Sequence, residues 1–407
     1  MAKEFNTIDD FDLKNKTVLV RIDINSPVDP STGIILDDMR MKLHSQTIKE
    51  LSDKGAKVVI LAHQSRPGKD DFTSLKQHAE EFSKTLNLKV GFADSIFSNS
   101  AKEKIKNLKP HDVLLLENVR FFSEEVISGN VKDLSESVLV KELSPLIDYY
   151  VNDAFAASHR SQISLIGFTL NTPSAAGKIM EEELSIIEGA LSNVKKPCVF
   201  LLGGMKPEDS VEVIENVLKN ETADIILTTG IVANIFLWAK GYDIQEINRE
   251  FLASRGYESI VKKAEELLKI YEDKIIYPCD VAIEKDSERV DVCIENIPNY
   301  PIFDIGVKSI KKYVNIIRSA KTIFANGPSG VFEKPEFAIG TEDLIYAIAA
   351  SEGFSIIGGG HIAAATASLG LNHKMNHVSS GGGACITLLS GKKLVAVEEL
   401  KNSYKRN

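Results

Sequence analysis

The sequence is poor in cysteine and has no long apolar run, and both features narrow the class of protein. Its cysteines, Cys198, Cys279, Cys293 and Cys385, stand alone, and none forms a C-x-x-C pair. This pattern indicates neither a zinc site nor a disulfide framework. We therefore expect small buried residues in a reducing cytosol, and a cytoplasmic protein. No apolar run is long enough to span a bilayer, and the polar, acidic N-terminus is unlike a signal peptide, so we expect no membrane partner.

Acidic residues outnumber basic ones, and arginine is scarce among the basic residues. The net charge is −9 at pH 7, which argues against nucleic acid as a partner, because phosphate backbones favour basic surfaces. Of the 48 basic residues only ten are arginine. The positions of these few arginines are therefore informative.

The length and the pattern of apolar runs predict the fold class. A chain of 407 residues is too long for one ordinary core, so we expect two domains. Short apolar runs alternate with charged, helix-like segments, which predicts βαβ units and mainly parallel sheets. The expected class is α/β, with two doubly wound, Rossmann-like domains joined by a helix and a hinge. The predicted strands are "TVLVRIDIN", "AKVVILAH", "DVLLLENV", "DYYVNDAF", "PCVFLLGG", "ADIILTTG", "KIIYPCDVAI", "TIFANGP" and "FSIIGGG". "DDMRMKLHSQTIKELSDKG" and "TSLKQHAEEFSKTLN" are predicted helices, and "AGKIMEEELSIIEGALSNVKKP" is the predicted connecting helix.

Four arginines of the first half follow or flank predicted strand ends, with two histidines near them. They are Arg40, Arg66, Arg120 and Arg160, and the histidines are His63 and His159. Since ligands of such sheets bind at the carboxyl ends of the strands, and arginine binds phosphate or carboxylate in bidentate fashion, we expect a shared anion site. A local ion pair is the alternative for each arginine taken alone. Arg21 lies inside a strand, and we assign it to a buried structural pair.

Glycine clusters indicate a second site in the other half. "GGMK", "ANGPSGVFE", "IIGGGH" and "SSGGGA" lie at or near predicted strand ends. Each cluster alone is weak evidence for a binding site, because glycines often mark turns. Together they suit the close approach of a backbone to a nucleotide, which needs residues without a Cβ. An anion clamp in one half and nucleotide loops in the other suggest a kinase that closes on its substrates.

The stretch "LLGGMKPEDS", from Leu201 to Ser210, resembles half of a phosphate-binding loop. An apolar run ends in two glycines, and a lysine follows. Such a break can present backbone N–H groups to an anion, but the full P-loop spacing is absent. The loop therefore predicts phosphate binding with part of the charge supplied from elsewhere.

A series of long motifs, in order along nearly the whole chain, resembles the phosphoglycerate kinase family. The motifs are "VLVRIDINSP", "DDMR", "AHQSRPG", "LLLENVRF", "YVNDAFAASHR", "FANGPSGVFE" and "HVSSGGGA". The resemblance implies reversible transfer of the acyl phosphate of 1,3-bisphosphoglycerate to Mg-ADP, giving 3-phosphoglycerate and ATP, in glycolysis and gluconeogenesis. It implies a glycerate-binding domain over residues 1–175, a connecting helix over 176–193 and a nucleotide-binding domain over 194–388. A tail over 389–407 is expected to return to the first domain, and the chain is expected to be a monomer.

The family's substrate residues can be carried over to matching positions. The resemblance implies a glycerate site made of Asp23, Ile24, Asn25, Arg40, His63, Gln64, Ser65, Arg66, Arg120 and Arg160. Within it, Asp23 and Asn25 are expected to orient the glycerate, and Arg40 to face the transferring group. The histidine and the other three arginines are expected to clamp the remote phosphate.

The nucleotide site implied by the resemblance consists of Gly203, Gly204, Lys206, Gly306, Glu333, Gly358, Gly359, Gly360 and His361. Glu333 is expected to bind the ribose hydroxyls. Arg40, Lys206, Gly381 and Gly382 are the expected catalytic residues, the last two through backbone N–H groups. We expect no direct protein ligand for the metal, because Mg²⁺ would arrive on the nucleotide phosphates.

Two positions depart from the common family pattern. The second lysine of G-G-x-K-x-x-D-K is Ser210 here, and the aspartate of G-G-G-D is His361. Both departures are similar to archaeal-type members, so we expect an archaeal-like subgroup. We expect His361 not to bind magnesium directly, since Mg²⁺ prefers oxygen ligands.

Two other functions stay open from the sequence. One is an acyl-phosphate kinase for another small acid. The arginine clamp disfavours simple acids, because it predicts a second anionic group on the substrate. The other is a catalytically silent nucleotide-binding regulator. Loss of Arg40 or Lys206 would have favoured the regulator, and both residues are present.

Overall fold

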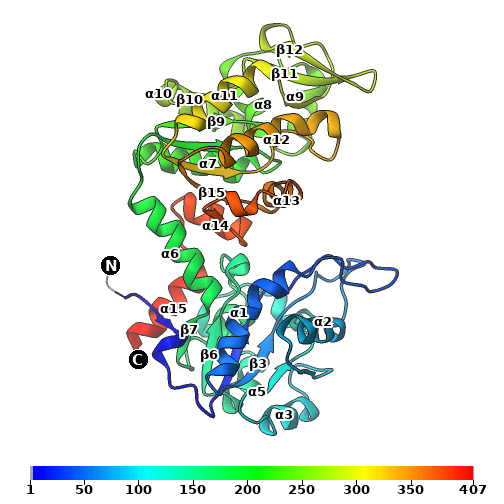
Figure 1. Cartoon of the computed structure of the whole chain (residues 1–407), viewed down its shortest axis with the longest axis vertical. Helices are drawn as coiled ribbons and strands as arrows, with labels where there is room; N and C mark the ends of the chain where they lie inside the picture. Colours follow the sequence, from blue (N-terminus) through cyan, green and yellow to red (C-terminus); the bar gives the residue numbers. More distant parts are fainter. Residues whose placement is uncertain (1–2, 407) are drawn as a thin grey trace. The chain divides into compact units, whose positions relative to one another are not determined.

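The chain is divided into two compact units, seen in a computed structural model that describes residues 3–406 (Figure 1). Unit 1 contains the chain up to Ser185 together with the C-terminal segment from Lys393, and unit 2 is Ile186–Lys392. The division falls inside helix α6, Lys178–Ser192. Unit 2 is thus inserted between two segments of unit 1.

Unit 1 is built on a sheet of parallel strands in the order β1-β7-β6-β2-β3-β5-β4. The central strands are buried on both faces, which explains their continuous apolar runs. The strands are β1 Asn6–Thr7, β2 Thr17–Arg21, β3 Lys57–Leu61, β4 Val90–Phe92, β5 Val113–Leu115, β6 Tyr149–Asn152 and β7 Ser174–Ala176. Its helices are α1 Met39–Asp53, α2 Lys76–Leu86, α3 Asn99–Lys106, α4 Val131–Ser135, α5 Val138–Leu143 and α15 Val395–Arg406.

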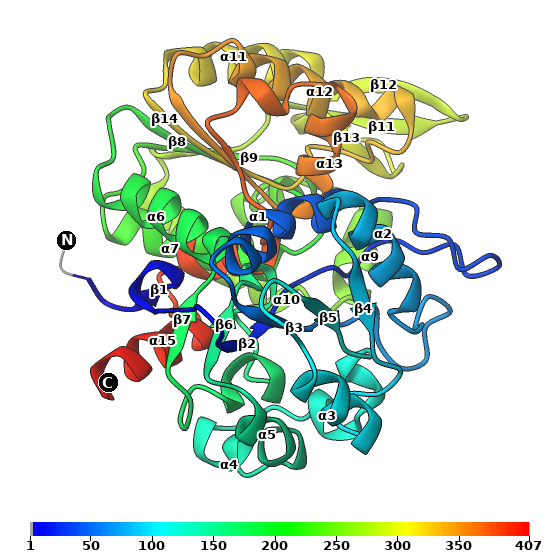
Figure 2. The same ribbon diagram turned by 60° about the horizontal axis from the view of Figure 1, so that its bottom comes forward.

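Helices cover both faces of this sheet. One apolar cluster joins one face of the sheet to α1 and α2, and a second joins the other face to α3 and α5. Helix α15 lies beside β7 (Figures 1 and 2), and the Ala396 N–H donates to the Ser158 carbonyl at 3.0 Å. The C-terminal segment is therefore part of the core of unit 1.

Unit 2 has a parallel sheet in the order β10-β9-β8-β14-β15-β16 and a separate antiparallel sheet in the order β12-β11-β13. Helices α11 and α12 lie side by side (Figure 2), and both pack on the parallel sheet. The strands are β8 Cys198–Leu202, β9 Ile225–Thr228, β10 Ile275–Ile276, β11 Asp280–Lys285, β12 Glu288–Cys293, β13 Ile302–Ile305, β14 Thr322–Asn326, β15 Phe354–Gly358 and β16 His377–Val378. The helices are α7 Pro207–Lys219, α8 Gly230–Lys240, α9 Glu246–Ser254, α10 Glu258–Tyr271, α11 Val307–Ser319, α12 Pro335–Ala349, α13 Gly360–Ser368 and α14 Gly382–Leu389.

The prediction of an α/β fold with two parallel sheets is confirmed, but one strand was predicted wrongly. The segment "KIIYPCDVAI" is not one strand: β10 belongs to the parallel sheet and β11 to the antiparallel one. Pro278 lies between them, and proline cannot donate to a ladder inside a sheet. The small antiparallel sheet was not predicted.

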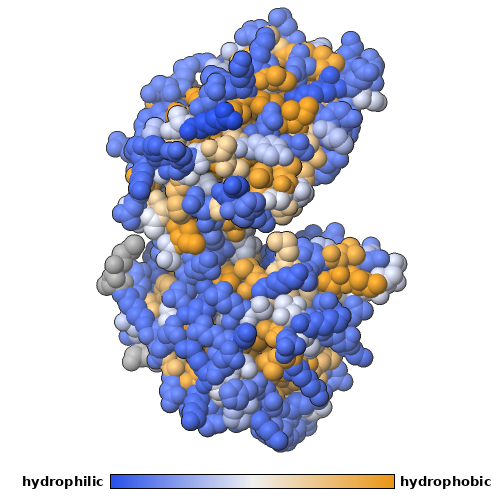
Figure 3. All heavy atoms as spheres, viewed as in Figure 1, coloured by the Kyte–Doolittle hydropathy of each residue, from blue (hydrophilic) through white to orange (hydrophobic). Residues whose placement is uncertain are grey.

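The surface and the cysteines complete the description. On the face drawn in Figure 3 hydrophilic side chains predominate, and apolar ones gather in small groups. Within residues 3–406, no helix combines the length and the apolar character that crossing a membrane requires. Cys198 and Cys385 are buried as expected, but Cys279 and Cys293 are exposed. Cys279 directly precedes β11 and Cys293 ends β12, in the antiparallel sheet that the sequence did not predict.

Candidate functional site

The loop after β2 places an ionised carboxylate at the C-terminal ends of the strands of unit 1. Asp23 is 5% exposed, and its Oδ2 lies 2.5 Å from a guanidinium nitrogen of Arg40, at the start of α1. Its Oδ1 accepts the Asn25 backbone N–H at 3.1 Å. Burial alone would raise the pKa of Asp23, but the charges of Arg40 and Arg21 more than offset it and lower that pKa. The structure thus brings Asp23, Asn25 and Arg40 together.

His63 follows the neighbouring strand β3 and is a neutral hydrogen-bond donor. Its Nδ1 lies 2.9 Å from a guanidinium nitrogen of Arg21, which can only donate, so Nδ1 accepts and Nε2 carries the proton. Burial lowers the pKa of His63 well below its usual range, and the charges of Arg21, Arg120 and Arg160 lower it further. His63 can therefore offer an N–H group to an anion without carrying a charge.

Arg21 is buried, as predicted, but its direct partner is not a carboxylate. Its Nε donates to Ser164 Oγ at 2.8 Å, and the Ser164 hydroxyl donates to Glu125 Oε1 at 2.6 Å. In place of the predicted ion pair, the Ser164 hydroxyl lies between the Arg21 guanidinium and the Glu125 carboxyl group and is hydrogen-bonded to both. A terminal nitrogen of the same guanidinium is hydrogen-bonded to His63 Nδ1 and so orients the imidazole.

Two of the predicted clamp arginines lie close enough to repel each other. Burial lowers the pKa of Arg120 to about 10, and the neighbouring charges of Arg160 and Arg21 add to the effect. Arg120 donates to the Ser65 carbonyl, and Arg160 donates to His159 Nε2 at 3.3 Å. Within residues 3–406 no carboxylate forms a direct ion pair with either arginine, although the charges of Glu125 and Asp23 act on Arg120. Both guanidinium groups can therefore bind an anion. Arg66 is exposed on the loop after β3.

The remaining predicted glycerate residues support the loops. The Gln64 side chain is buried, accepts the Ser26 N–H at 3.1 Å and donates to the Ser26 carbonyl at 2.8 Å. Ser65 has a positive φ of 54°, which is strained for a residue other than glycine, and its N–H donates to Asn25 Oδ1 at 2.7 Å. Ile24 is in the core. Substrate contacts by these residues stay predictions.

In unit 2, the N-termini of three helices meet at one cavity of about 370 Å³. The helices are α7, which begins directly after "GGMK", and α13 and α14, which begin inside "IIGGGH" and "SSGGGA". Free N–H groups and the helix dipole make such N-termini favourable for anions. The cavity is lined by Gly203, Gly204, Met205, Lys206, Asp209, Ser210, Asn326, Gly327, Pro328, Gly359, Gly360, His361, Gly382, Gly383 and Ile386.

Glycine is required where these loops approach each other. A Cβ on Gly327, whose φ is +78°, would lie 2.4 Å from the Gly203 carbonyl oxygen. A Cβ on Gly382 would lie 3.0 Å from the Gly359 Cα. Backbone therefore packs on backbone around the cavity, and the Gly203 and Gly204 N–H groups donate to the carbonyls of Asn326 and Pro328.

Five polar side chains of different character line this cavity. Lys206 and His361 are exposed, Asp209 and Asn326 are half-buried, and Ser210 is 2% exposed. Ser210, at the position of the family's second lysine, adds no charge. Asp209 was not predicted, although it is the only aspartate or glutamate among the residues that line this cavity.

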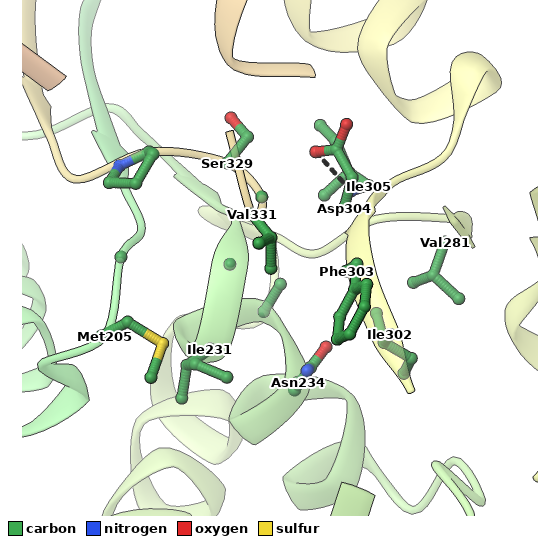
Figure 4. A pocket seen from close by; sticks show the side chains of 15 residues that line it. Met205, Ile231, Asn234, Val281, Ile302, Phe303, Asp304, Ile305, Ser329 and Val331 are labelled. Carbon is green, nitrogen blue, oxygen red and sulfur yellow. Dashed lines mark hydrogen bonds between the residues drawn. The ribbon is translucent and has the colours of Figure 1, made fainter. Parts of the chain in front are cut away.

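A smaller pocket of about 60 Å³ adjoins the cavity and is mostly apolar (Figure 4). Gly204, Met205 and Pro328 line both. In Figure 4 the Phe303 ring and the Asn234 amide lie near each other, and Ile231 lies near Met205. The sequence analysis missed these residues, because apolar residues after strand ends are ordinary core positions.

Four predicted residues lie outside both linings. A Cβ on Gly306 would lie 2.3 Å from the Asp280 carboxyl carbon, so packing explains this glycine. A Cβ on Gly358 would lie 3.0 Å from Cys385 Sγ. Gly381 is the N-cap of α14. Glu333 is exposed and follows Val331, a residue of the smaller pocket, by two positions in the sequence. Their roles toward a nucleotide stay predictions.

Comparison with known proteins agrees with this arrangement. The phosphoglycerate kinase family profile matches residues 8–392. The phosphoglycerate kinase of Methanothermobacter thermautotrophicus is 55% identical over 400 residues, covering 98% of this chain and 97% of the relative. That of Methanobacterium bryantii is 56% identical over 400 residues, covering 98% of each. The crystal structure of phosphoglycerate kinase from Pyrococcus horikoshii superposes with a TM-score of 0.92 at 42% identity, covering 99% of this chain and 100% of the other. The predicted archaeal-like subgroup is thereby confirmed, and the chain belongs to the phosphoglycerate kinase family.

Proposed function

We propose that this kinase of glycolysis, whose phosphoryl acceptor is a carboxyl group, binds the glycerate on unit 1 and the nucleotide on unit 2. The reaction is the reversible transfer of the acyl phosphate of 1,3-bisphosphoglycerate to ADP, giving 3-phosphoglycerate and ATP. Each substrate then contributes its reacting phosphoryl or carboxyl group from a different unit. Transfer requires the two groups to come into line.

One observation carries the nucleotide half of this proposal: the N-termini of α7, α13 and α14 point at one cavity. A nucleotide polyphosphate there would be held by backbone N–H groups and by Lys206. The adjoining apolar pocket suits the purine base, since Phe303, Val331 and Ile231 offer apolar surface and the Asn234 amide can hydrogen-bond.

The glycerate half rests on charge and hydrogen-bond polarity. Arg120, Arg160 and neutral His63 all present donors to an anion, which fits the remote phosphate of 3-phosphoglycerate. Asp23 and Asn25 can orient the hydroxyl end of the substrate. Arg40 lies at the start of α1, beside Asp23, and from there its guanidinium would contact the phosphoryl group being transferred.

No general base is needed in either direction. The nucleophile is already an anion, a carboxylate one way and a nucleotide phosphate the other. The protein has to align the groups and neutralise charge that spreads over the equatorial oxygens. Arg40, Lys206 and the N–H groups of Gly381 and Gly382 would do this, and exclusion of water would protect the acyl phosphate from hydrolysis.

The lining of the cavity fits a magnesium-bound nucleotide. An aspartate beside a phosphate site repels polyphosphate alone, but it suits a divalent cation carried by that polyphosphate. Asp209 is thus the candidate to complete the metal's shell, directly or through water, where His361 replaces the family's aspartate. When bound, Mg²⁺ would neutralise phosphate charge during transfer.

A coupled assay of the full chain with ATP and 3-phosphoglycerate tests the proposal. We expect 3-phosphoglycerate-dependent ADP formation, and no comparable rate with acetate, which lacks the second anionic group. Comparable rates with acetate would favour another acyl-phosphate kinase, and nucleotide binding without turnover would favour a silent regulator. The family match favours neither alternative. We also propose that the enzyme is a cytoplasmic monomer, which light scattering and cell fractionation can test.

A further inference from the structure

A histidine interrupts the apolar face of α1. Met41, Ile48 and Leu51 form that face with 0% exposure, and His44, at helical spacing from them, is 3% exposed. Burial of an imidazole among apolar side chains is unfavourable unless its nitrogens are hydrogen-bonded. The partners of His44 therefore indicate why it is there.

Both ring nitrogens of His44 have partners, and these partners fix its tautomer. Nε2 lies 3.2 Å from the backbone nitrogen of Asp23, and Nδ1 lies 2.8 Å from Asp153 Oδ2. A backbone N–H can only donate, so Nε2 must accept, and the ring proton is on Nδ1, where it is donated to the carboxylate. His44 thus links Asp153 to the loop that carries Asp23.

Asp153 is itself held in place from the opposite side. Its Oδ1 accepts the N–H groups of Ile179 at 2.9 Å and Met180 at 3.3 Å, in the first turn of α6. The fit is tight, because a Cβ on Gly177 would lie 2.3 Å from this oxygen. One buried carboxylate therefore caps the helix that leads into unit 2 and also orients His44.

We propose that His44 is a positioning residue for the glycerate site. Asp153 fixes the imidazole, and the imidazole holds the Asp23 backbone so that the Asp23 carboxylate faces Arg40 and the Asn25 N–H. The proposal rests on the assignment of Asp23 to the glycerate in the proposed function. Its new content is that this loop takes its position from the first turn of α6.

Two substitutions break the link at different points. His44→Ala leaves the Asp23 N–H without a partner, and the loop must then be reordered by the substrate. Asp153→Asn keeps a carbonyl oxygen for α6 but turns its N–H₂ group toward His44. The imidazole then accepts at Nδ1 and directs an N–H from Nε2 at the Asp23 N–H. Each variant should raise the KM for 3-phosphoglycerate about tenfold, the effect of one unpaired buried donor, with the KM for ATP changed less than about twofold.

A double substitution and a matched control separate positioning from stability. If both residues act through one link, Asp153→Asn in the His44→Ala background should raise the KM for 3-phosphoglycerate no further. Thr47→Val is the control, because Thr47 Oγ1 accepts the Lys178 N–H at 3.1 Å and so supports the same turn of α6 without touching the Asp23 loop. It should lower the unfolding midpoint and leave the KM for 3-phosphoglycerate unchanged.

Amide hydrogen exchange at Asp23 gives a readout that does not depend on activity. Exchange should be slow in the parent and in Thr47→Val, and faster in His44→Ala and Asp153→Asn. Faster exchange with an unchanged KM for 3-phosphoglycerate would overturn the positioning role, as would additive effects in the double variant. A parent without 3-phosphoglycerate kinase activity would instead contradict the proposed function, and unchanged exchange in both variants would refute the link itself.

Discussion

Arg40 carries a charge that Asp23 balances at 2.5 Å, on a side chain that is still 39% exposed. Arg40→Ala should lower turnover by about 10³–10⁵, the range for an arginine that neutralises a transferring phosphoryl group, with a smaller effect on substrate KM values. Steady-state kinetics of the purified variant measures this. Arg249→Ala, which removes a surface arginine paired with Asp243 in unit 2, is the matched control and should keep the parent's turnover. A loss below tenfold in Arg40→Ala would contradict the assigned role.

Asp209 and His361 line the same cavity but should differ in their effect on the metal requirement. Asp209→Asn should raise the Mg²⁺ concentration needed for half-maximal activity at least about tenfold, since the carboxylate proposed to complete the metal's shell, directly or through water, is lost. His361→Gln should keep the parent's requirement, with turnover lowered by no more than about 10². Titration of activity with Mg²⁺ at fixed ATP compares them. A shifted metal requirement in His361→Gln alone would reverse the assignment.

His78 makes unit 1 sensitive to acid. It is 1% exposed on α2, and burial lowers its pKa from 6.5 to about 4. Because the folded state binds the proton less readily than the unfolded chain, stability is lost as the pH falls from 6.5 toward 4. This residue alone should reduce the free energy of unfolding by about 2 kcal/mol between pH 7 and pH 5. Urea unfolding of His78→Gln at both pH values should show a smaller loss than the parent, and an equal loss would show that His78 is not responsible.

Among the elements, the glycine loops of unit 2 depend on backbone-to-backbone packing. Gly327→Ala would place a Cβ 2.4 Å from the Gly203 carbonyl oxygen at a φ of +78°, so the loops must separate. We expect the affinity for ATP, measured by calorimetry, to fall at least about tenfold. Gly256→Ala has a similar φ of +76° but no heavy atom within 4 Å of its Cβ. It should lose only the stability that the strained φ costs, about 1–2 kcal/mol, and bind ATP as the parent does.

The sequence predicted the central strands of both parallel sheets, two helices of unit 1 and the connecting helix, because long apolar runs and helical periodicity are local signals. Edge strands such as β1, β4 and β16 have two or three residues and leave no pattern of this kind. The antiparallel sheet was missed because β12 is largely exposed and Pro278 was read as part of one strand.

For the site, residue type and position relative to strand ends singled out His63, Arg120, Lys206 and the glycine clusters, and their roles toward substrates stay predictions. The supporting contacts were not predictable. The link from Asp153 through His44 to Asp23 joins residues 109 and 21 positions apart. The orientation of His63 by Arg21 spans 42 positions. Such contacts follow from packing across the sheet. Periodicity within a short segment carries no information about them.

For the whole molecule, we propose that the two units close on each other during the reaction. A glycerate bound, as proposed, to unit 1 and a nucleotide bound, as proposed, to unit 2 cannot exchange a phosphoryl group until the reacting atoms are in line. Small-angle scattering should therefore give a smaller radius of gyration with ATP and 3-phosphoglycerate together than with neither ligand. Either ligand alone is the control and should have a smaller effect. An unchanged radius with both would count against a hinge near α6.

The return of α15 to unit 1 sets an order for the synthesis of the chain. Ala396 of this helix belongs to the same apolar cluster as Leu19 and Tyr150, so unit 1 cannot finish its core before α15 has left the ribosome. All of unit 2 is translated before this helix. Unit 2 can therefore reach its final fold first. Until α15 is made, part of the core of unit 1 stays exposed.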